Sequence, residues 1–278
     1  MNKIFLSLTL GIIFHSSINA QFYYRDLLGN QQLRKEWETY KAAGIRHISI
    51  KSFEPDGSES KGFFCKKKFS KDYRKSELGN RSAGSAPSLL TTLFDDKGHI
   101  LSTLDTSEFS VTQIRYTRDA SGRILSIQSR IHSADEDFVA ELNEEHQYSY
   151  EEGDSLPKEL LVIRPQKDTD FIVFARDEKG RISIEKSSLT GKSYYYYYDD
   201  AGRLTDIVRE QERNGALLPD YMFEYDDKGR MVKMTSTEEA SSNYWVWLYM
   251  YNEQGLRIKE KIFSKERQLV GSLGYEYK

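Results

Sequence analysis

The sequence has almost no cysteine: Cys65 is the single one among 278 residues, so no disulfide can form within the chain. The fold must therefore be held by burial of apolar side chains and by backbone hydrogen bonds. Basic residues do not outnumber acidic ones either. The formal net charge is −3, which argues against a dedicated nucleic-acid-binding protein. After residue 20 the sequence also lacks an apolar run of membrane length, so we expect no transmembrane span.

Motifs for catalysis and cofactor binding are missing as well. Gly191-Lys192-Ser193 resembles the end of a phosphate-binding loop, but Lys186 stands where that loop needs a glycine, and a strand is predicted to follow. No G-x-S-x-G turn marks a nucleophilic serine. The histidines after residue 20 lack the paired spacing of metal ligands: His47, His99, His132 and His146. We therefore predict no catalytic residue, no metal site and no cofactor, although carboxylates from different hairpins could meet in space.

What the sequence does have is a short phrase that returns six times: an aromatic strand end, Asp or Asn, two further residues, Gly, usually Arg, and then an aliphatic residue. The third residue before each glycine is always Asp or Asn. The pairs are Asp95 and Gly98, Asp119 and Gly122, Asp177 and Gly180, Asp199 and Gly202, Asp226 and Gly229, and Asn252 and Gly255. A phrase that returns in this way indicates a repeat architecture.

The spacing is that of a tight hairpin turn. Asp or Asn at the first turn position bonds back to the turn backbone, and Gly at the fourth takes the left-handed conformation. Weaker copies lie at Phe53–Gly57 and Tyr150–Asp154. Counting both arms of each hairpin predicts roughly fifteen to seventeen strands, and open sheets of more than about ten strands tend to curl or split. The predicted fold is all-β: a repetitive antiparallel hairpin meander, strongly curved into a spiral, half-barrel or barrel.

The phrase resembles the YD repeat of bacterial RHS-type proteins. The best-matched segments are Tyr198–Ile207 and Tyr225–Met234, and the resemblance covers most of residues 90–278. It implies β-hairpin repeats wound into a curved sheet or shell on exported or cell-surface proteins. Large family members enclose a toxin, but this chain has no recognisable core junction or toxic C-terminal domain. It looks like the repeat module alone, as in small exported YD-repeat proteins of Gram-negative bacteria.

The first 20 residues have the three parts of a secretory signal peptide: Lys3, the apolar run Ile4–Phe14, and the polar stretch His15–Ala20. We expect the mature protein to begin at Gln21, without a lipid anchor, in the periplasm or at the cell surface or outside the cell. Residues 21–44 form an N-terminal segment with one helix, and residues 45–278 form the repeat domain, with a polar loop predicted at residues 76–88.

The predicted helix is Gln31–Ala43. Asn30 can cap its start and Gly44 can end it. Leu33, Trp37 and Tyr40 fall on one helical face, which we expect to cover part of one face of the sheet.

Two strands near the C-terminus are apolar on both faces, which makes them the candidate binding surface. Tyr196, Tyr198, Tyr225 and Tyr249 share the inward register of the repeat. The predicted binding residues point the other way: Tyr195, Tyr197, Tyr244, Val246 and Leu248. Either the helix face of Leu33, Trp37 and Tyr40 covers these residues and they are core, or they form an open platform for sugar rings or a partner protein.

A basic run from Lys61 to Lys75 also has two interpretations. It could bind an anionic glycan or a lipid headgroup. Lysines of this kind also protect exposed strand edges from aggregation, which is the interpretation the sequence favours.

Taken together, these features predict a non-catalytic exported binding or scaffold module, with a glycan or an envelope protein as its partner. An enzyme with a site assembled from several hairpins and an outer-membrane β-barrel are the alternatives. Ligand identity and oligomeric state do not follow from the sequence.

Overall fold

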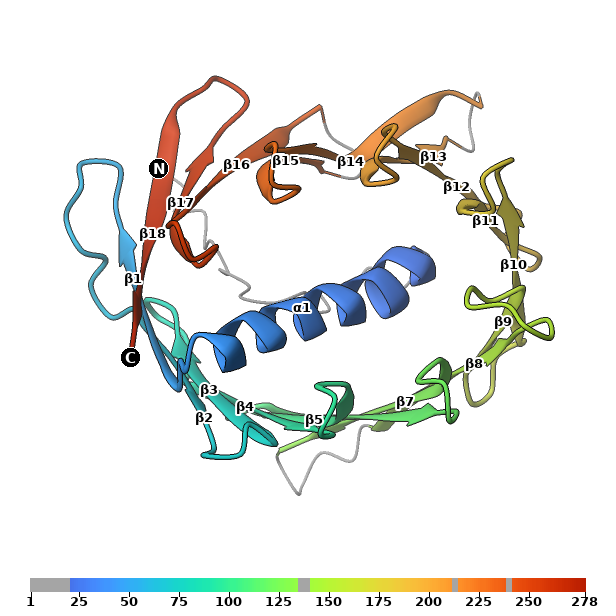
Figure 1. Ribbon diagram of the computed structural model, residues 1–278, viewed down its shortest axis with the longest axis horizontal. Helices are drawn as coiled ribbons and strands as arrows, with labels where there is room; N and C mark the ends of the chain where they lie inside the picture. Colours follow the sequence, from blue (N-terminus) through green and yellow to red (C-terminus); the bar gives the residue numbers. More distant parts are fainter. Residues whose placement is uncertain (1–20, 135–140, 212–214, 239–241) are drawn as a thin grey trace.

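The protein folds into one closed antiparallel β-barrel. Its structure, a computed structural model, describes residues 21–134, 141–211, 215–238 and 242–278. The chain follows the wall in sequence order, and the last strand pairs with the first, so that all 18 strands have two neighbours (Figure 1). Closure therefore decides among the spiral, the half-barrel and the barrel. The predicted signal peptide, residues 1–20, lies outside the described residues.

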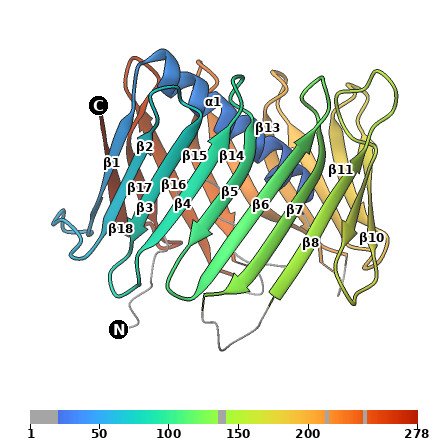
Figure 2. The same cartoon turned by 90° about the horizontal axis from the view of Figure 1, so that it is seen from below.

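The wall consists of eighteen strands of five to ten residues each. They are β1 (His47–Phe53), β2 (Phe64–Phe69), β3 (Lys75–Arg81), β4 (Ser88–Phe94), β5 (Ile100–Thr106), β6 (Ser110–Arg118), β7 (Ile124–Ser133), β8 (Glu141–Ser149), β9 (Glu159–Ile163), β10 (Asp170–Arg176), β11 (Ile182–Ser187), β12 (Ser193–Tyr198), β13 (Leu204–Glu210), β14 (Leu217–Tyr225), β15 (Met231–Thr237), β16 (Tyr244–Tyr251), β17 (Arg257–Phe263) and β18 (Leu269–Tyr277). Figure 2 shows them side by side and tilted in the wall.

The N-terminal helix lies inside the barrel rather than on its outer face. A π-helical turn, η1 (Tyr23–Leu28), runs directly into α1 (Gly29–Ala42), and α1 crosses the lumen (Figure 1). Barrels of this strand number have a lumen too wide for wall side chains alone to fill, so a filler is needed. Gly44 (φ +70°) ends the helix as predicted. The predicted start is wrong: Asn30 lies within the helix, and its Nδ2 donates to the carbonyl of Asp26 at 2.7 Å.

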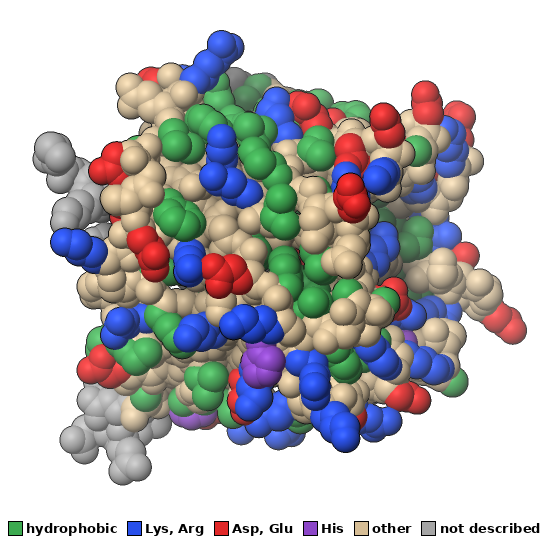
Figure 3. All heavy atoms as spheres, turned by 60° about the vertical axis from the view of Figure 1, so that its left-hand side comes forward, with side chains coloured by type: hydrophobic (Ala, Val, Ile, Leu, Met, Phe, Trp, Pro, Cys, Tyr) green, Lys and Arg blue, Asp and Glu red, His purple; other side chains and the backbone are tan. Residues whose placement is uncertain are grey.

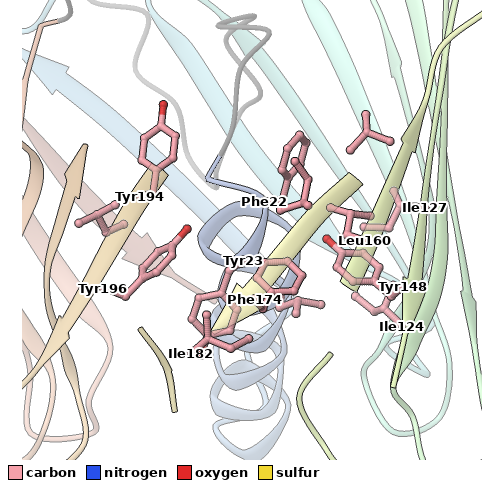
Figure 4. Packing of buried hydrophobic residues seen from close by; sticks show 14 of the residues in the cluster. Phe22, Tyr23, Ile124, Ile127, Tyr148, Leu160, Phe174, Ile182, Tyr194 and Tyr196 are labelled. Carbon is pink, nitrogen blue, oxygen red and sulfur yellow. The ribbon is translucent and has the colours of Figure 1, made fainter. Parts of the chain in front are cut away.

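Two apolar clusters fill the lumen around the two halves of this N-terminal segment. Around η1, Phe22 and Tyr23 insert between Tyr196 on one wall and Tyr148 and Leu160 on the other (Figure 4). Around α1, the predicted helical face of Leu33, Trp37 and Tyr40 packs against the inner side of β1–β5 and β18. The buried wall residues there are Ile48, Ile50, Cys65, Phe69, Leu78, Phe94, Ile100, Leu273 and Tyr275.

The repeat turns form as the sequence predicts. All six glycines have positive φ, between +74° at Gly229 and +90° at Gly122. Each turn closes with the glycine N–H donating to the carbonyl of the Asp or Asn three residues earlier, as at Gly202 and Asp199 (3.0 Å). The wall is therefore a meander of hairpins built on one turn type.

The predicted polar loop at residues 76–88 is mostly wrong. Residues 75–81 form β3, which pairs with β2 and β4 along its whole length, and only residues 82–87 separate β3 from β4. Ser76 and Leu78 alternate as inward, buried residues, at 2% and 5% exposed, so a strand pattern is present behind the polar composition. Gly79 faces outward, where the Phe64 ring lies 3.1 Å from the position of an added Cβ.

Alanine at two of the repeat glycines should separate backbone strain from steric overlap. Nothing lies within 4 Å of a Cβ added at Gly202, whereas one added at Gly98 would be 2.3 Å from the Trp37 ring. Gly202→Ala should lower the free energy of unfolding by about 1 kcal/mol through the left-handed backbone alone. Gly98→Ala should cost clearly more in urea unfolding, and equal costs would show that Trp37 does not rest on the Gly98 turn.

Trp37 should be a major determinant of stability. It is 5% exposed, its Nε1 donates to the carbonyl of Tyr73 at 2.9 Å, and its ring packs near Phe94. Trp37→Ala should lower the free energy of unfolding by about 3–5 kcal/mol, as for other buried aromatic residues. Glu38→Ala, at an exposed position of the same helix, is the control and should change urea unfolding little.

Candidate functional site

The Asp-x-x-Gly-Arg turns are coupled to one another along one rim of the barrel. At Asp199, the N–H of Arg203 donates to Oδ1 (2.8 Å) and Arg203 Nε donates to Oδ2 (2.6 Å). The guanidinium lies over the Tyr225 ring at 4.9 Å, and Nη1 donates to the carbonyl of Asp226 in the next turn (3.2 Å). The Tyr225 hydroxyl donates back to the carbonyl of Leu204 at 2.7 Å.

The same five contacts recur in the neighbouring copies. Arg181 stacks over Tyr198 and Arg230 over Tyr251, and each reaches the carbonyl that begins the next turn. Hydrogen bonds from these arginines lower the pKa of Asp177 and of Asp226. The residues that define the phrase are thus used in holding each hairpin to the next.

Two copies depart from this scheme. In the first, His99 stands where four of the other turns have arginine. Its Nδ1 bonds Asp95 Oδ2 at 2.8 Å, and its Nε2 accepts from Arg34 of α1 at 3.0 Å, because a guanidinium can only donate. In the last copy, Asn252 and Leu256 replace the charged pair, and the Leu256 N–H still donates to Asn252 Oδ1. The first copy therefore ties the rim to the helix.

A buried polar constellation fastens η1 to the wall. His146 on β8 lies between two carboxylates: its Nδ1 donates to Asp26 Oδ2 (2.5 Å) and its Nε2 to Glu144 Oε1 (2.7 Å). The Tyr148 hydroxyl also donates to Asp26 Oδ2 at 2.7 Å, and Arg164 Nε donates to Glu144 Oε2 at 2.5 Å. Asp26 and His146 are 1% and 5% exposed.

Electrostatics favour an imidazolium at this position. Burial alone would disfavour the charged ring, but the charges of Asp26 and Glu144 and their hydrogen bonds outweigh it and raise the pKa of His146 to about 9. For Glu144, burial is again opposed by His146 and Arg164, and its pKa falls to about 2. A charged histidine between two carboxylates holds η1 and β8 together.

A second carboxylate caps the start of η1. Glu185 on β11 is 1% exposed and accepts from the N–H groups of Phe22 (3.0 Å) and Tyr23 (2.9 Å) and from the Tyr196 hydroxyl (2.8 Å). Burial raises the pKa of the Glu185 carboxyl, and the hydrogen bonds from these donors offset only part of that rise. The site holds the N-terminal segment by its otherwise unpaired amides.

A third polar cluster fastens α1 to β17 and β18. Arg257 Nη1 donates to Glu260 Oε1 at 2.7 Å, Arg257 Nη2 lies 3.8 Å from Glu36 Oε1 on the helix, and the Tyr275 hydroxyl donates to Glu260. The guanidinium also stacks over the Tyr249 ring at 4.6 Å. The carboxylates of these clusters thus link the N-terminal segment to the wall: Glu185 to the η1 amides, Asp26 to His146, and Glu36 to Arg257. Sequence reasoning missed these residues, although the alternation of His146 and Tyr148 along one strand is a signal that they share the inner face.

The predicted binding residues lie on the outer side of the wall. Inward Tyr196 is 2% exposed and its neighbour Tyr197 is 46% exposed, because successive side chains of a strand point to opposite faces. Tyr195 pairs with Val208, and its hydroxyl donates to Glu210 at 3.3 Å. The interpretation that helix residues cover this surface is wrong, since α1 and η1 lie on the other face.

These five residues form two groups rather than one. Tyr195 and Tyr197 lie on β12, and Tyr244, Val246 and Leu248 lie on β16, with three strands between them. Between them the outward row contains Asp206, Met222 and Thr235, in the register Asp206↔Met222↔Thr235↔Val246. We call this surface the aromatic strip. On the adjoining side of the barrel, around β1 and β18, Figure 3 shows apolar side chains in a band among charged ones.

A shallow hollow of ≈ 360 Å³ lies over β6–β9. Its outward lining is mainly amide and guanidinium groups from adjacent strands: Gln113, Arg115, Gln128, Arg130 and Asn143. Gln128 Nε2 donates to Glu145 Oε1 across the strands at 3.3 Å. Ser129 and the carboxylate of Glu144, which contacts His146 and Arg164, also line the hollow.

The remaining sequence candidates have structural explanations. Cys65 is buried, and burial raises the pKa of its thiol to about 11, so it is a poor nucleophile. Gly191 closes a hairpin, with its N–H donating to the carbonyl of Ser187 at 3.0 Å. Within residues 21–134, 141–211, 215–238 and 242–278, no group of three or more His, Cys, Asp or Glu side chains is placed to hold a metal ion. The helices in these ranges are too short or too polar to cross a membrane.

Comparisons with known proteins give the following similarities. No protein-family model and no curated protein matches the chain. Among solved structures, the chain is similar to a porin-like protein from Bacteroides uniformis ATCC 8492, with 9% identity over 84% of this chain and 98% of that chain and a TM-score of 0.38. It is also similar to part of a Photorhabdus luminescens Tc holotoxin pore, with 12% identity over 86% of this chain and 17% of that chain and a TM-score of 0.30. At such values these similarities assign no function.

The constellation at His146 predicts how stability depends on pH. The folded pKa is raised to about 9 from an ordinary value of 6.5, so the ion pairs contribute fully below pH 6.5 and their contribution is lost as pH rises through 9. In urea unfolding between pH 6 and pH 10, wild type should lose this stability, and His146→Gln should be less stable at pH 6 with a flatter profile. His132→Gln, at an exposed position of β7, should keep the wild-type profile. An unchanged profile in His146→Gln would contradict a charged His146.

Proposed function

We propose that this chain is an exported, non-catalytic binding or scaffold protein of the YD-repeat type, whose outer wall recognises a glycan or an envelope protein through the aromatic strip. One observation carries this proposal: Tyr195, Tyr197, Tyr244, Val246 and Leu248 lie on the outer side of the wall, while the helix packs against the inner side. The predicted signal peptide supports export.

The filled lumen supports a function for the outer wall rather than for the interior. Asp26, His146 and Glu185 would be the strongest candidates for acid–base chemistry, but all three are at most 5% exposed and contact η1. A substrate could reach them only if the N-terminal segment left the barrel. Their contacts are those of an anchor, which supports a non-catalytic protein.

The distribution of charge supports a wall that faces water. Inward positions of the strands carry the apolar core, whereas charged side chains stand at outward positions in the middle of strands. Examples of such outward residues are Lys66, Glu145, Glu224, Lys233 and Lys261. A membrane-spanning barrel has the opposite arrangement, with an apolar band outside and polar residues inside. The outer-membrane alternative is therefore disfavoured.

Tyrosines on the strip suit a flat ligand. Each offers a rigid apolar ring with a hydroxyl at its tip, and Tyr197 is 46% exposed. Glu210 beside Tyr195 and the Lys233–Glu224 pair (2.7 Å) add polar groups at the borders. Rings flanked by such groups could stack on sugar faces and bond their hydroxyls, or form the anchor of a protein interface.

Removal of the two β12 tyrosines should test the strip. Residues 21–278 would be probed on a glycan array and by retention of envelope proteins from the source cells. Tyr195→Ala with Tyr197→Ala should weaken the detected binding about tenfold or more, as for aromatic hot spots, and leave the melting temperature nearly unchanged. Phe171→Ala, 52% exposed on β10, is the matched control and should bind as wild type. A loss of stability without any detectable ligand would refute a binding role for the strip.

A further inference from the structure

A leucine-rich stripe occupies the outer face of β4 and β5. Leu89, Leu93, Leu101 and Leu104 are 38–45% exposed, and Thr91 and Ser102 lie between them in register. No charged side chain stands at an outward position of these two strands. Figure 2 shows β4 and β5 side by side in the barrel wall. We call this surface the leucine stripe.

The leucines are exposed because the inner face of the same strands is already occupied. Leu90, Thr92 and Phe94 alternate with them and point to the lumen, where Phe94 packs near Trp37 at 6.2 Å between ring centroids. The outward residues of β4 are then fixed by the period of two. An apolar surface that the core does not need calls for a partner.

Basic residues border the leucine stripe on the β2–β3 side. Lys66 and Lys68 point outward from β2, and Lys75 and Arg81 from β3, with Glu77 among them. Figure 3 shows Lys and Arg side chains gathered over the lower part of the wall, toward β2 and β3. The interpretation of this basic run as protection of a strand edge is wrong, because β2 pairs with both β1 and β3.

The opposite border carries charges of both signs. Arg115 on β6 stands directly across from Ser102, and no carboxylate of the described residues lies within ion-pair distance of it. Farther along the wall, Arg130 on β7 pairs with Glu141 at 3.1 Å, and Glu145 on β8 lines the same hollow. The leucine stripe thus has a basic border toward β2 and β3 and Arg115 on its other side.

We propose that the leucine stripe and the basic border of β2 and β3 dock the barrel onto the surface of an anionic phospholipid bilayer. Two contributions hold a protein on such a surface. Leucines enter the headgroup region of the bilayer, and lysines and arginines bind the anionic headgroups. The aromatic strip is not of this kind, since Asp206 lies within it and Glu210 and Glu224 lie at its borders. The docking surface is independent of the aromatic strip and leaves that strip free.

Charge argues against a second copy as the occupant. A symmetric dimer that set the basic border of β2 and β3 against its own copy would place lysines opposite lysines. Like charges held opposite each other across an interface oppose association. An anionic bilayer complements this basic border and Arg115 at once.

Co-sedimentation with lipid vesicles tests this proposal. Residues 21–278 should bind vesicles of phosphatidylcholine mixed with phosphatidylglycerol, not vesicles of phosphatidylcholine alone, and added salt should release them. Lys66→Gln with Lys68→Gln should lower the binding constant about 25-fold, from about fivefold for each basic residue near the surface. Leu93→Ser with Leu104→Ser should lower it about tenfold or more through the loss of apolar contact.

Controls separate docking from folding and from self-association. Phe171→Ser with Val173→Ser removes side chains of similar exposure (52% and 47%) on β10 and should leave vesicle binding unchanged. All variants should keep the wild-type melting temperature, since the substituted side chains face outward. Equal binding to neutral vesicles, no binding to anionic ones, or a dimer that the leucine substitutions dissociate without any lipid would each overturn the proposal.

Discussion

Closure of the sheet is the constraint on which the rest of the structure depends. Ile48 through Phe53 on β1 pair with Ser272 through Tyr277 on β18, so the first and last strands complete a ring of eighteen. A ring of this size has no unpaired edge, but it has a lumen that short wall side chains cannot fill. The segment that precedes β1 solves this, because it enters the lumen and supplies Phe22, Tyr23 and Trp37 to two cores that the wall alone would leave open.

Placing a helix inside a barrel raises the question of how it finds one orientation, since apolar packing by itself tolerates sliding. The answer here is a set of directional polar contacts at both ends. Glu185 caps the first amides of η1, Asp26 reaches His146, and Glu36 reaches Arg257. Burying such charges costs desolvation free energy, and they stabilise the fold only when they are fully paired. We therefore assign to them the fixing of the helix position in the barrel more than a gain in net stability.

The sequence could predict the repeating parts of this fold and not its closure. Turn chemistry is local: Asp199, Gly202 and Arg203 determine their hairpin through contacts within five residues, and all six copies form as predicted. The position of the helix is not local. Leu33, Trp37 and Tyr40 correctly indicate an apolar face, but the same face could have covered the outside of an open sheet. The sequence does not predict the strand at residues 75–81, because residues such as Ser76 and Gly79 are polar or small. The strand shows only in the burial of alternate residues, Ser76 and Leu78.

The candidate sites show the same division between local and non-local information. Alternation along β12 is enough to place Tyr195 and Tyr197 opposite Tyr196, and the structure keeps that order. Alternation does not tell which face of the sheet is the inner one. In a closed barrel that holds a helix, the inner side chains are buried and the outer ones are exposed, so the exposure of each residue depends on this assignment. Once the lumen is assigned to the N-terminal segment, the outer wall is the surface left for a partner. Exposed apolar residues occur around that wall, and those on β4–β5 and on β12–β16 are the ones for which we propose partners.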